Sequence, residues 1–222
     1  MIITIDGPAG TGKSTVARRL AAQLGFVYFD TGAMYRALTF QILREKIALD
    51  DEQGSRGIVE QFSFHIRPSP AGPRYIVGDE DVSEVIRSVE VTAAVSQVAA
   101  LPWVRHSLVN IQRKFGSDCN AVFEGRDLGS VVFPNADLKV FLTASPEVRS
   151  QRRYDEWLAK NPQDAPSKEQ VLRDLLQRDH LDSTRQHSPL IQPQDALVID
   201  TSGLTVEQIV DRLVTAWHNK HL

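Results

Sequence analysis

The sequence predicts an α/β protein in which a parallel sheet is flanked by helices on both faces. Two observations lead to this prediction. Short apolar runs of strand length alternate along the chain with longer segments whose apolar residues recur at helical spacing. Such continuous apolar runs are typical of strands that helices bury on both faces. The chain has 222 residues, of which 42% are hydrophobic and 24% charged, so it is long enough for an ordinary globular core.

The alternation begins at the N-terminus. Ile2–Asp6 is an apolar run that is predicted to form a buried strand, and Lys13–Leu24 follows as a helix with one apolar face. We expect Gly25 to end this helix, because glycine readily takes the left-handed conformation found there. A second strand is predicted at Phe26–Asp30 and a second helix at Ala33–Glu45.

The same alternation returns in the second half of the chain. The predicted strands there are Ala121–Glu124, Leu138–Leu142 and Ala196–Asp200. The predicted helices are Pro146–Lys160, Lys168–His180 and Thr205–Lys220. Strands that are joined through helices need crossover connections, so we expect the sheet to be parallel.

Two stretches interrupt this pattern within what we predict to be a single domain spanning residues 1–222. Residues 63–85 hold a proline-rich spacer, Arg67–Pro73, between two short alternating segments, which predicts a small antiparallel insertion. Residues 154–170 join two polar helices through a segment that contains Pro162 and Pro166. We interpret the connection at Asn161–Ser167 as mobile and facing solvent.

Charge and composition argue against several classes of protein. The formal net charge of −3 is evenly spread, which argues against a surface that coats a nucleic acid. No apolar run approaches the ~18 residues of a membrane span, and the N-terminus lacks the basic segment of a signal peptide. The single Cys119 excludes an internal disulfide and a zinc site built from cysteines. We therefore expect a cytoplasmic monomer that binds neither nucleic acid nor membranes.

The strongest functional signal is a phosphate-binding loop between the first strand and the first helix. Residues 7–15 fit the pattern G-x-x-x-x-G-K-[ST], in which glycines let backbone N–H groups surround an anion at a helix N-terminus. Lys13 is placed to reach the β and γ phosphates, and the Ser14 hydroxyl can hold Mg²⁺, partly through water. The residues of this predicted triphosphate site are Gly7, Pro8, Ala9, Gly10, Thr11, Gly12, Lys13, Ser14 and Thr15.

Such a loop does not distinguish a kinase from a nucleotide-dependent switch, so a phosphoryl acceptor has to be sought at the other strand ends. Thr31 and Arg36 follow the second predicted strand, although Asp30 or Thr31 could be a plain helix cap. Glu124–Gly129 ends a third strand with carboxylates and an arginine. An ordinary polar turn is the alternative interpretation there.

Two groups of charged residues each share one face of a predicted helix. The first group is Arg149, Arg152 and Arg153. The second, if its helix continues past His180, is Arg178, Asp182 and Arg185. Exposed arginines often serve only solubility. Several arginines near a phosphate loop, however, supply the charge neutralisation that phosphoryl transfer needs.

Taken in order, the motifs resemble those of the bacterial cytidylate kinases, the (d)CMP kinases of the nucleoside monophosphate kinase group. The resemblance extends from Ile5 to Asp200, which is nearly the whole chain. Beside the phosphate loop, its motifs are Asp30–Arg36, Glu80–Ser83, Ser96–Ala100, Gly125–Gly129 and Arg178-Asp179. The insertion at 63–85 is similar to the monophosphate-binding subdomain of these enzymes, and Asn161–Ser167 is similar to their short, zinc-free lid, which we expect within residues 154–170.

The resemblance implies a P-loop kinase fold and transfer of the γ-phosphoryl group of ATP to CMP or dCMP, with Mg²⁺ as cofactor. It implies that Arg36 and Arg126 hold the acceptor α-phosphate. It places Ser96, Arg178 and Asp182 at the ribose. It places Thr31, Arg105, Asp127 and Arg185 around the cytosine. On the donor side it adds Arg149, Arg152 and Arg153 to the ATP-binding loop. The residues expected to act in catalysis are Lys13, Arg36, Arg126 and Arg153.

Two positions depart from the pattern of many relatives. Thr31 stands where serine is frequent, which adds a methyl group near the base, and Glu124 stands where aspartate is common, which leaves contacts with metal-bound water open. A kinase for UMP or another small acceptor is one alternative function, and Asp127 argues against it because a carboxylate accepts from the cytosine amine but repels the uracil carbonyl. A nucleotide-dependent switch is the other alternative.

Overall fold

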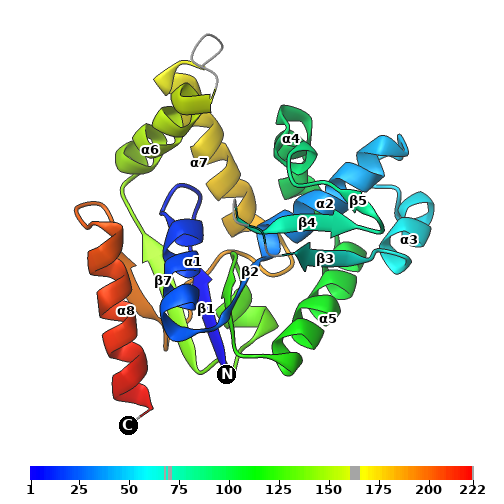
Figure 1. Ribbon diagram of the computed structural model, residues 1–222. Helices are drawn as coiled ribbons and strands as arrows, with labels where there is room; N and C mark the ends of the chain where they lie inside the picture. The colour runs from blue at the N-terminus through cyan, green and yellow to red at the C-terminus, as the bar shows by residue number, and fades with distance from the viewer. Residues whose placement is uncertain (68, 70–71, 161–165, 222) are drawn as a thin grey trace. The chain divides into compact units, whose positions relative to one another are not determined.

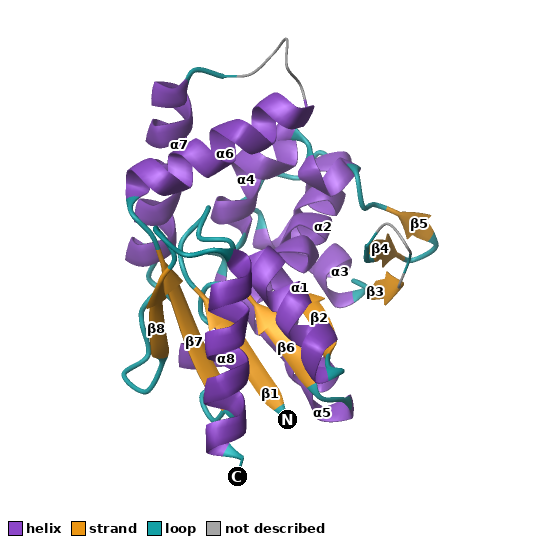
Figure 2. Cartoon of the chain, turned by 60° about the vertical axis from the view of Figure 1, so that its left-hand side comes forward, coloured by secondary structure: helices purple, strands orange, loops and turns teal. Residues whose placement is uncertain are grey.

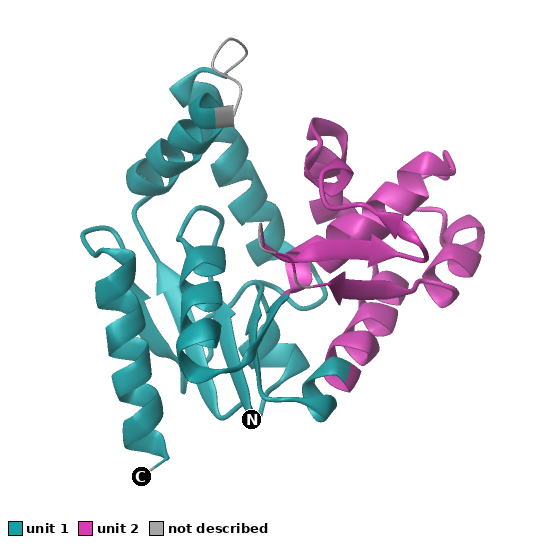
Figure 3. Ribbon diagram, viewed as in Figure 1, with its two compact units in different colours: residues 1–29, 115–222 teal, residues 30–114 magenta. Residues whose placement is uncertain are grey.

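The computed structural model describes residues 1–67, 69, 72–160 and 166–221 (Figure 1). The chain divides into two compact units, which are coloured separately in Figure 3. Unit 1 contains residues 1–29 and 115–222, and unit 2 contains residues 30–114. The boundaries that we predict for the insertion at 63–85 and the lid at 154–170 stay predictions, and residues 68, 70–71 and 161–165 of these segments lie outside the described residues.

Unit 1 is built on the predicted parallel sheet. Its strand order is β2-β6-β1-β7-β8, and β1 pairs in parallel with β6 and β7, while β7 pairs in parallel with β8. The central position of β1 confirms the α/β prediction, because the first strand lies between strands that follow more than a hundred residues later. The strands are β1 (Ile2–Asp6), β2 (Val27–Asp30), β6 (Ala121–Glu124), β7 (Leu138–Thr143) and β8 (Leu197–Asp200).

Helices α1 and α8 cover one face of this sheet, in front of the strands in Figure 2. Leu20 of α1 and Leu213 of α8 are fully buried in one apolar cluster with Ile3, Ile5 and Leu142 of the strands. Burying side chains of this size stabilises a fold by ~1.5–3 kcal/mol each. The helices of unit 1 are α1 (Lys13–Leu24), α6 (Pro146–Lys160), α7 (Lys168–Thr184) and α8 (Val206–Lys220), with a short helical turn η2 (Leu128–Val132).

Unit 2 combines helices with a small antiparallel sheet. The sheet order is β3-β4-β5, and Phe64 pairs with Val77 in the hairpin that residues 63–85 were predicted to form. Its elements are α2 (Thr31–Arg44), α3 (Glu52–Glu60), β3 (Phe64–Arg67), β4 (Arg74–Val77), β5 (Glu80–Asp81), η1 (Val85–Arg87) and α4 (Val89–Val98). Helix α5 (Pro102–Asp118) begins in unit 2 and ends in unit 1.

The sequence analysis assigned no element to α3, α4 or α5. Helix α4 did carry a usable signal, because Val91, Ala94, Val95 and Val98 recur at helical spacing and are all buried. Ser88 caps this helix by accepting a hydrogen bond from the Val91 N–H. Helix α7 extends to Thr184, beyond the predicted end at His180. Among the described residues, no helix is both long and apolar enough to cross a membrane.

Asp6 ties the end of β1 to the loop after β6. Its buried carboxylate accepts hydrogen bonds from the backbone N–H groups of Leu128 (2.9 Å) and Gly129 (2.8 Å), where η2 begins. Burial raises the pKa of Asp6 to about 6, although both hydrogen bonds lower it. The residue therefore fixes the start of the phosphate loop against the segment that carries Arg126 and Asp127.

Replacing Asp6 by alanine should lower the free energy of unfolding by ~2–5 kcal/mol, because two buried N–H donors lose their acceptor. Urea titration measures the loss. Asp137→Ala is the matched control, because Asp137 accepts from one part-buried N–H, that of Ile2, at the other end of β1. If Asp6→Ala lowers the free energy of unfolding no more than Asp137→Ala does, the role given to Asp6 is contradicted.

The same variant has a pH signature. Because the pKa of Asp6 is higher in the folded chain than in the unfolded chain, the stability that this carboxyl contributes falls as pH rises between ~4 and ~6. The destabilisation by Asp6→Ala should therefore be larger near about pH 4.5 than near about pH 7. A loss independent of pH would argue against the raised pKa.

Candidate active site

The phosphate loop is held in shape by close backbone approaches. A Cβ atom on Gly7 would lie 2.1 Å from the carbonyl oxygen of Leu142, and one on Gly10 would lie 2.9 Å from that of Arg149. Both glycines also have positive φ angles, 145° and 78°. Helix α1 then begins after Gly12, which is left-handed and provides no side-chain cap. The first N–H groups of α1 are therefore left for an anion.

Lys13 lies inside this loop and is buried. Its ammonium donates to the carbonyl oxygen of Pro8 (2.7 Å) and lies 3.5 Å from Thr11 Oγ1. Burial, together with the positive charge of Arg126, lowers the pKa of Lys13 well below its ordinary value. A phosphate group beside the ammonium would oppose this shift, so the charge of Lys13 is suited to an anionic ligand.

Ser14 and Glu124 bring two oxygen ligands together at the entrance to α1. Ser14 Oγ donates to Glu124 Oε2 (2.8 Å), and the Tyr28 hydroxyl donates to Glu124 Oε1. Oxygen donors of this kind are what Mg²⁺ prefers, so the pair fits the cofactor expected from the sequence. Glu124 was noted there as a departure, but Tyr28 was missed because no motif marks the middle of a strand.

Residues after β6 and at the end of α7 form one cluster of ion pairs in unit 1. Arg126 Nε donates to Asp182 Oδ2 (2.9 Å), and Arg185 lies 3.9 Å from Asp182 and 3.3 Å from Asp127. Burial opposes ionisation of Asp182, but Arg126, Arg178 and Arg185 outweigh it and lower its pKa. The sequence predicted these residues as parts of one site, and the structure brings them together.

Arg178 stands out in this cluster because part of its guanidinium lacks a partner. Its Nε is buried and has no hydrogen-bond partner among the described residues. Burial, and then the positive charge of Arg126, lowers the pKa of Arg178 to about 10. A buried N–H donor near the positive charges of Arg126 and Arg153 is favourable only when an anion or a polar ligand accepts its hydrogen bond.

The three arginines predicted on one face of α6 make three different contacts. Arg149 is buried and donates to the carbonyl oxygens of Ala144 and Ala9, each at 3.0 Å. Arg152 donates to Thr201 Oγ1 (3.0 Å) and to the Thr201 carbonyl oxygen (2.7 Å). Arg153 is exposed and pairs with Glu156 at 2.8 Å. Arg149 thus contacts the phosphate loop directly.

Thr201 connects Arg152 to the same loop. Its hydroxyl donates to the carbonyl oxygen of Thr11 (3.1 Å) while accepting from Arg152. Thr201 follows β8 and is fully buried. The sequence analysis missed it, since a threonine after a strand carries no motif.

Unit 2 holds the remaining predicted residues. Arg36 Nη1 donates to Thr92 Oγ1 (2.7 Å) and to the Ile86 carbonyl oxygen (3.3 Å), and Thr92 lies one turn of α4 before Ser96. Arg105 is buried, donates to the Ala99 carbonyl oxygen (3.1 Å) and stacks over the Tyr35 ring at 5.5 Å.

The structure shows which of Asp30 and Thr31 caps helix α2, a choice that the sequence left open. The cap of α2 is Asp30, whose carboxylate accepts from the Ala33 N–H (2.9 Å), whereas Thr31 is the buried first residue of the helix.

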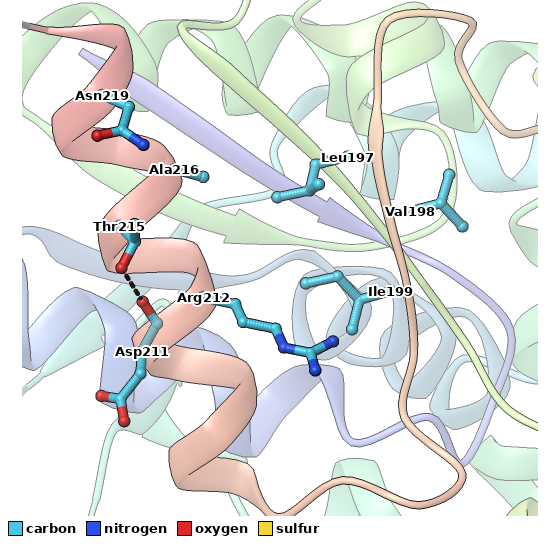
Figure 4. Close-up of a pocket in the computed structure, with 8 residues that line it drawn as sticks. All are labelled: Leu197, Val198, Ile199, Asp211, Arg212, Thr215, Ala216 and Asn219. Atoms are coloured by element: carbon cyan, nitrogen blue, oxygen red, sulfur yellow. Dashed lines mark hydrogen bonds between the residues drawn. The ribbon is translucent and has the colours of Figure 1, made fainter.

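A pocket of about 480 Å³ lies between β8 and α8 (Figure 4). Its floor is apolar, and Thr215 on its rim donates to the Asp211 carbonyl oxygen (2.8 Å). None of the predicted site residues lines it. The lining residues are Leu197, Val198, Ile199, Asp211, Arg212, Thr215, Ala216 and Asn219.

The strand β1, the glycine loop and the N-terminus of α1, with Lys13 inside and Arg126 and Arg149 nearby, define a P-loop nucleotide-binding protein. The chain belongs to the cytidylate kinase family, whose model, described as "Cytidylate kinase", matches residues 3–219. It is therefore an enzyme of the nucleoside monophosphate kinase type. The resemblance inferred from the motifs is confirmed.

Curated relatives agree with this assignment. A cytidylate kinase of Protochlamydia amoebophila (strain UWE25) is 50% identical over 216 residues, which cover 96% of this chain and 95% of that protein. A cytidylate kinase of Carboxydothermus hydrogenoformans is 48% identical over 214 residues, with 96% of each chain covered. A solved structure of an uncharacterized protein from Eubacterium ventriosum ATCC 27560 has a similar fold, with a TM-score of 0.53 and 12% identity over 99% of this chain and 98% of that one.

The contact between Tyr28 and Glu124 gives a testable prediction about Mg²⁺. Tyr28→Phe removes the hydroxyl that holds Glu124, so it should weaken ADP binding about threefold or more in the presence of Mg²⁺ and leave binding in EDTA unchanged. Isothermal titration calorimetry measures both affinities. Tyr154→Phe is the matched control, because the Tyr154 ring in α6 lies under Lys168 away from Glu124. Equal losses with and without Mg²⁺ would contradict this role.

Proposed function

We propose that the protein transfers the γ-phosphoryl group of ATP to CMP or dCMP, giving ADP and CDP or dCDP. The observation that carries this proposal is the phosphate loop of unit 1, with Lys13 inside it, together with the cluster that Arg126 and Asp127 after β6 form with Asp182 of α7. Family membership supports the acceptor, because the relatives that cover nearly the whole chain are named cytidylate kinases.

On the donor side, the loop residues 7–15 are proposed to bind the triphosphate of ATP. The Lys13 ammonium and the Arg149 guanidinium lie at the loop and neutralise negative charge on the phosphates. We propose that Arg152 and Arg153 of α6 also serve the donor side. Mg²⁺, held by Ser14 and with Glu124 in its surroundings, supplies further charge neutralisation when it is bound.

On the acceptor side, two groups of residues are proposed to bind CMP. Arg126, Asp127, Arg178, Asp182 and Arg185 come from unit 1. Thr31, Arg36, Ser96 and Arg105 come from unit 2. The α-phosphate is assigned to Arg36 and Arg126, since a planar guanidinium binds phosphate through two parallel hydrogen bonds. The ribose is assigned to Ser96, Arg178 and Asp182.

The cytosine is assigned to Thr31, Arg105, Asp127 and Arg185. Asp127 is buried and pairs with Arg185 at 3.3 Å, so its carboxylate is held in place before any base is present. A carboxylate accepts a hydrogen bond from the exocyclic amine of cytosine but faces the lone pairs of the uracil carbonyl. Burial makes this mismatch costly, which supports cytosine over uracil.

The chemistry is one in-line transfer without a covalent enzyme intermediate. An α-phosphate oxygen of CMP attacks the γ-phosphorus of ATP, a new P–O bond forms, and the bond to the β-phosphate oxygen breaks to release ADP. The attacking oxygen is already ionised at neutral pH, so no general base is required. Lys13, Arg36, Arg126 and Arg153 are proposed to stabilise the charge that develops on the transferred group.

The direct test is ADP release from Mg-ATP with CMP, dCMP, UMP, AMP, GMP and shikimate offered separately. Turnover with CMP and dCMP well above the others is expected. If only another acceptor supports turnover, the protein is still a kinase, but the residues assigned to the cytosine do not bind that base. No dependence on any acceptor would favour a nucleotide-dependent switch. The cytoplasmic location and the monomeric state inferred from the sequence stay predictions.

Lys13→Ala should lower kcat by about two orders of magnitude or more while the far-ultraviolet circular dichroism stays that of the wild type, because the loop loses the cation at the β and γ phosphates. Lys220→Ala near the end of α8 is the control and should be unchanged. Near-normal turnover of Lys13→Ala with CMP would refute the role of the loop in transfer.

Asp127→Ala should lower kcat/KM for CMP, because the partner of the cytosine amine is lost. The ratio of kcat/KM for CMP to that for UMP should therefore fall by about tenfold. Comparing kcat/KM for the two acceptors measures the selectivity. Asp118→Ala, at an exposed position near the end of α5, is the matched control. An unchanged ratio of CMP to UMP efficiency would show that Asp127 does not select the base.

A further inference from the structure

Asp179 of α7 joins three segments of unit 1 and has no role in the function proposed above. Its Oδ2 accepts from Arg149 Nη1 of α6 (2.5 Å), and its Oδ1 accepts from the Ala9 N–H of the phosphate loop (3.3 Å). The same Nη1 donates to the Ala9 carbonyl oxygen (3.0 Å). The Ala9 residue is therefore held at both its N–H and its C=O by one ion pair.

Arg149 needs this partner because it is buried. Its side chain is 6% exposed, and that of Asp179 is 18% exposed. A guanidinium taken out of water is costly unless a counter-charge and hydrogen-bond acceptors replace the lost hydration. Arg149 Nε donates to the Ala144 carbonyl oxygen (3.0 Å), and Asp179 is the only carboxylate within ion-pair distance of Arg149 in the described part of the chain.

Three of the five N–H groups of Arg149 are engaged. Nε and Nη1 are engaged with Ala144, Ala9 and Asp179, and no hydrogen bond of Nη2 occurs within the described residues. Because the guanidinium is planar, fixing Nε and Nη1 also fixes the plane and the direction of the two N–H groups of Nη2. The ion pair with Asp179 thus decides where the remaining donors of Arg149 point.

The backbone at Gly10 also lies against Arg149, which gives a second contact between the phosphate loop and α6. A Cβ atom at Gly10 would lie 3.0 Å from the Cβ of Arg149 as well as against its carbonyl, so the loop and α6 touch at this residue. Any change in the position of Arg149 would therefore shift the loop beside it.

We propose that Asp179 is a positioning residue for the ATP donor: through its ion pair with Arg149 and its hydrogen bond with Ala9 it holds the guanidinium and the phosphate loop in one fixed arrangement that receives the donor phosphates. This inference rests on the proposed function for the donor only and is independent of which acceptor is used. The carboxylate acts through Arg149 and Ala9, so it touches no reacting atom.

The experiment compares Asp179→Ala and Asp179→Asn with the full-length enzyme. Binding of ADP with Mg²⁺ is measured by isothermal titration calorimetry, and KM is determined for ATP and CMP separately. Asp179→Ala should weaken ADP binding and raise KM for ATP by about tenfold or more, with KM for CMP within about twofold of wild type. Asp179→Asn keeps an acceptor for the Ala9 N–H but loses the charge, so its effect should be intermediate.

A double-mutant cycle with Arg149→Ala tests the mechanism. If Asp179 acts through Arg149 as well as through Ala9, the loss of ADP affinity in the double variant should be clearly smaller than the two single losses combined. Asp174→Ala is the matched control, because Asp174 lies on the exposed side of α7 and accepts from Gln170 at 2.6 Å. Additive losses in the cycle would overturn the proposal.

A merely structural role makes a different prediction. It would lower the thermal stability and raise KM for ATP and CMP alike, which would overturn the proposal as well. Because ADP binding needs no acceptor, its outcome is separate from the test of the proposed function. If the wild-type enzyme shows no turnover with CMP, CMP is not the acceptor. If Asp179→Ala nevertheless binds ADP more weakly, the role of Asp179 is still supported.

Discussion

The arrangement of unit 1 depends on the burial of positive charge beside a glycine loop. Burial, and then the positive charge of Arg126, lowers the pKa values of both Lys13 and Arg178, and Arg178 also lowers that of Lys13. The carboxylates of the cluster compensate part of this charge but leave the Nε of Arg178 without a partner in the described chain. A site with this balance favours a polyanion, since each phosphate relieves both the repulsion and the unmet hydrogen bonding.

Backbone geometry explains why this charge gathers at one edge of the sheet. The parallel order β6-β1-β7 places the carboxyl ends of three strands together, so the loop after β1, the segment after β6 and the start of α6 are neighbours. Gly7 and Gly10 then let the loop approach Leu142 and Arg149 more closely than any side chain would allow. The carboxylate of Asp6 completes the arrangement by fixing η2 against the end of β1.

Periodicity and turn chemistry were sufficient to predict most of unit 1. Helix α1 runs from Lys13 to Leu24 as predicted, because a strand, a glycine motif and Gly25 delimit it on both sides. Unit 2 was predicted only in part: its small antiparallel sheet was expected, but no helix was assigned to α3, α4 or α5, although the apolar spacing in α4 is that of a helix. The sequence indicates no role for Tyr28, Thr201 and Asp179, because each contacts a residue that is distant along the chain. The separations are 96 positions for Tyr28, 190 for Thr201 and 170 for Asp179. Such long-range pairing has no local signal.

The hydrogen bonds of the site also indicate which interactions favour the donor. Lys13 donates to the carbonyl oxygen of Pro8, Arg149 to that of Ala9, and Arg152 to that of Thr201. A phosphate oxygen that takes the place of the Pro8 carbonyl at Lys13 exchanges one hydrogen bond for another, so the number of bonds changes little. What changes is the charge of the atom that accepts the hydrogen bond, because a charged phosphate oxygen binds a cation about twice as strongly as a neutral carbonyl oxygen does. Under the proposed function, affinity for the donor depends on holding these cations in place, as Asp179 is proposed to do for Arg149.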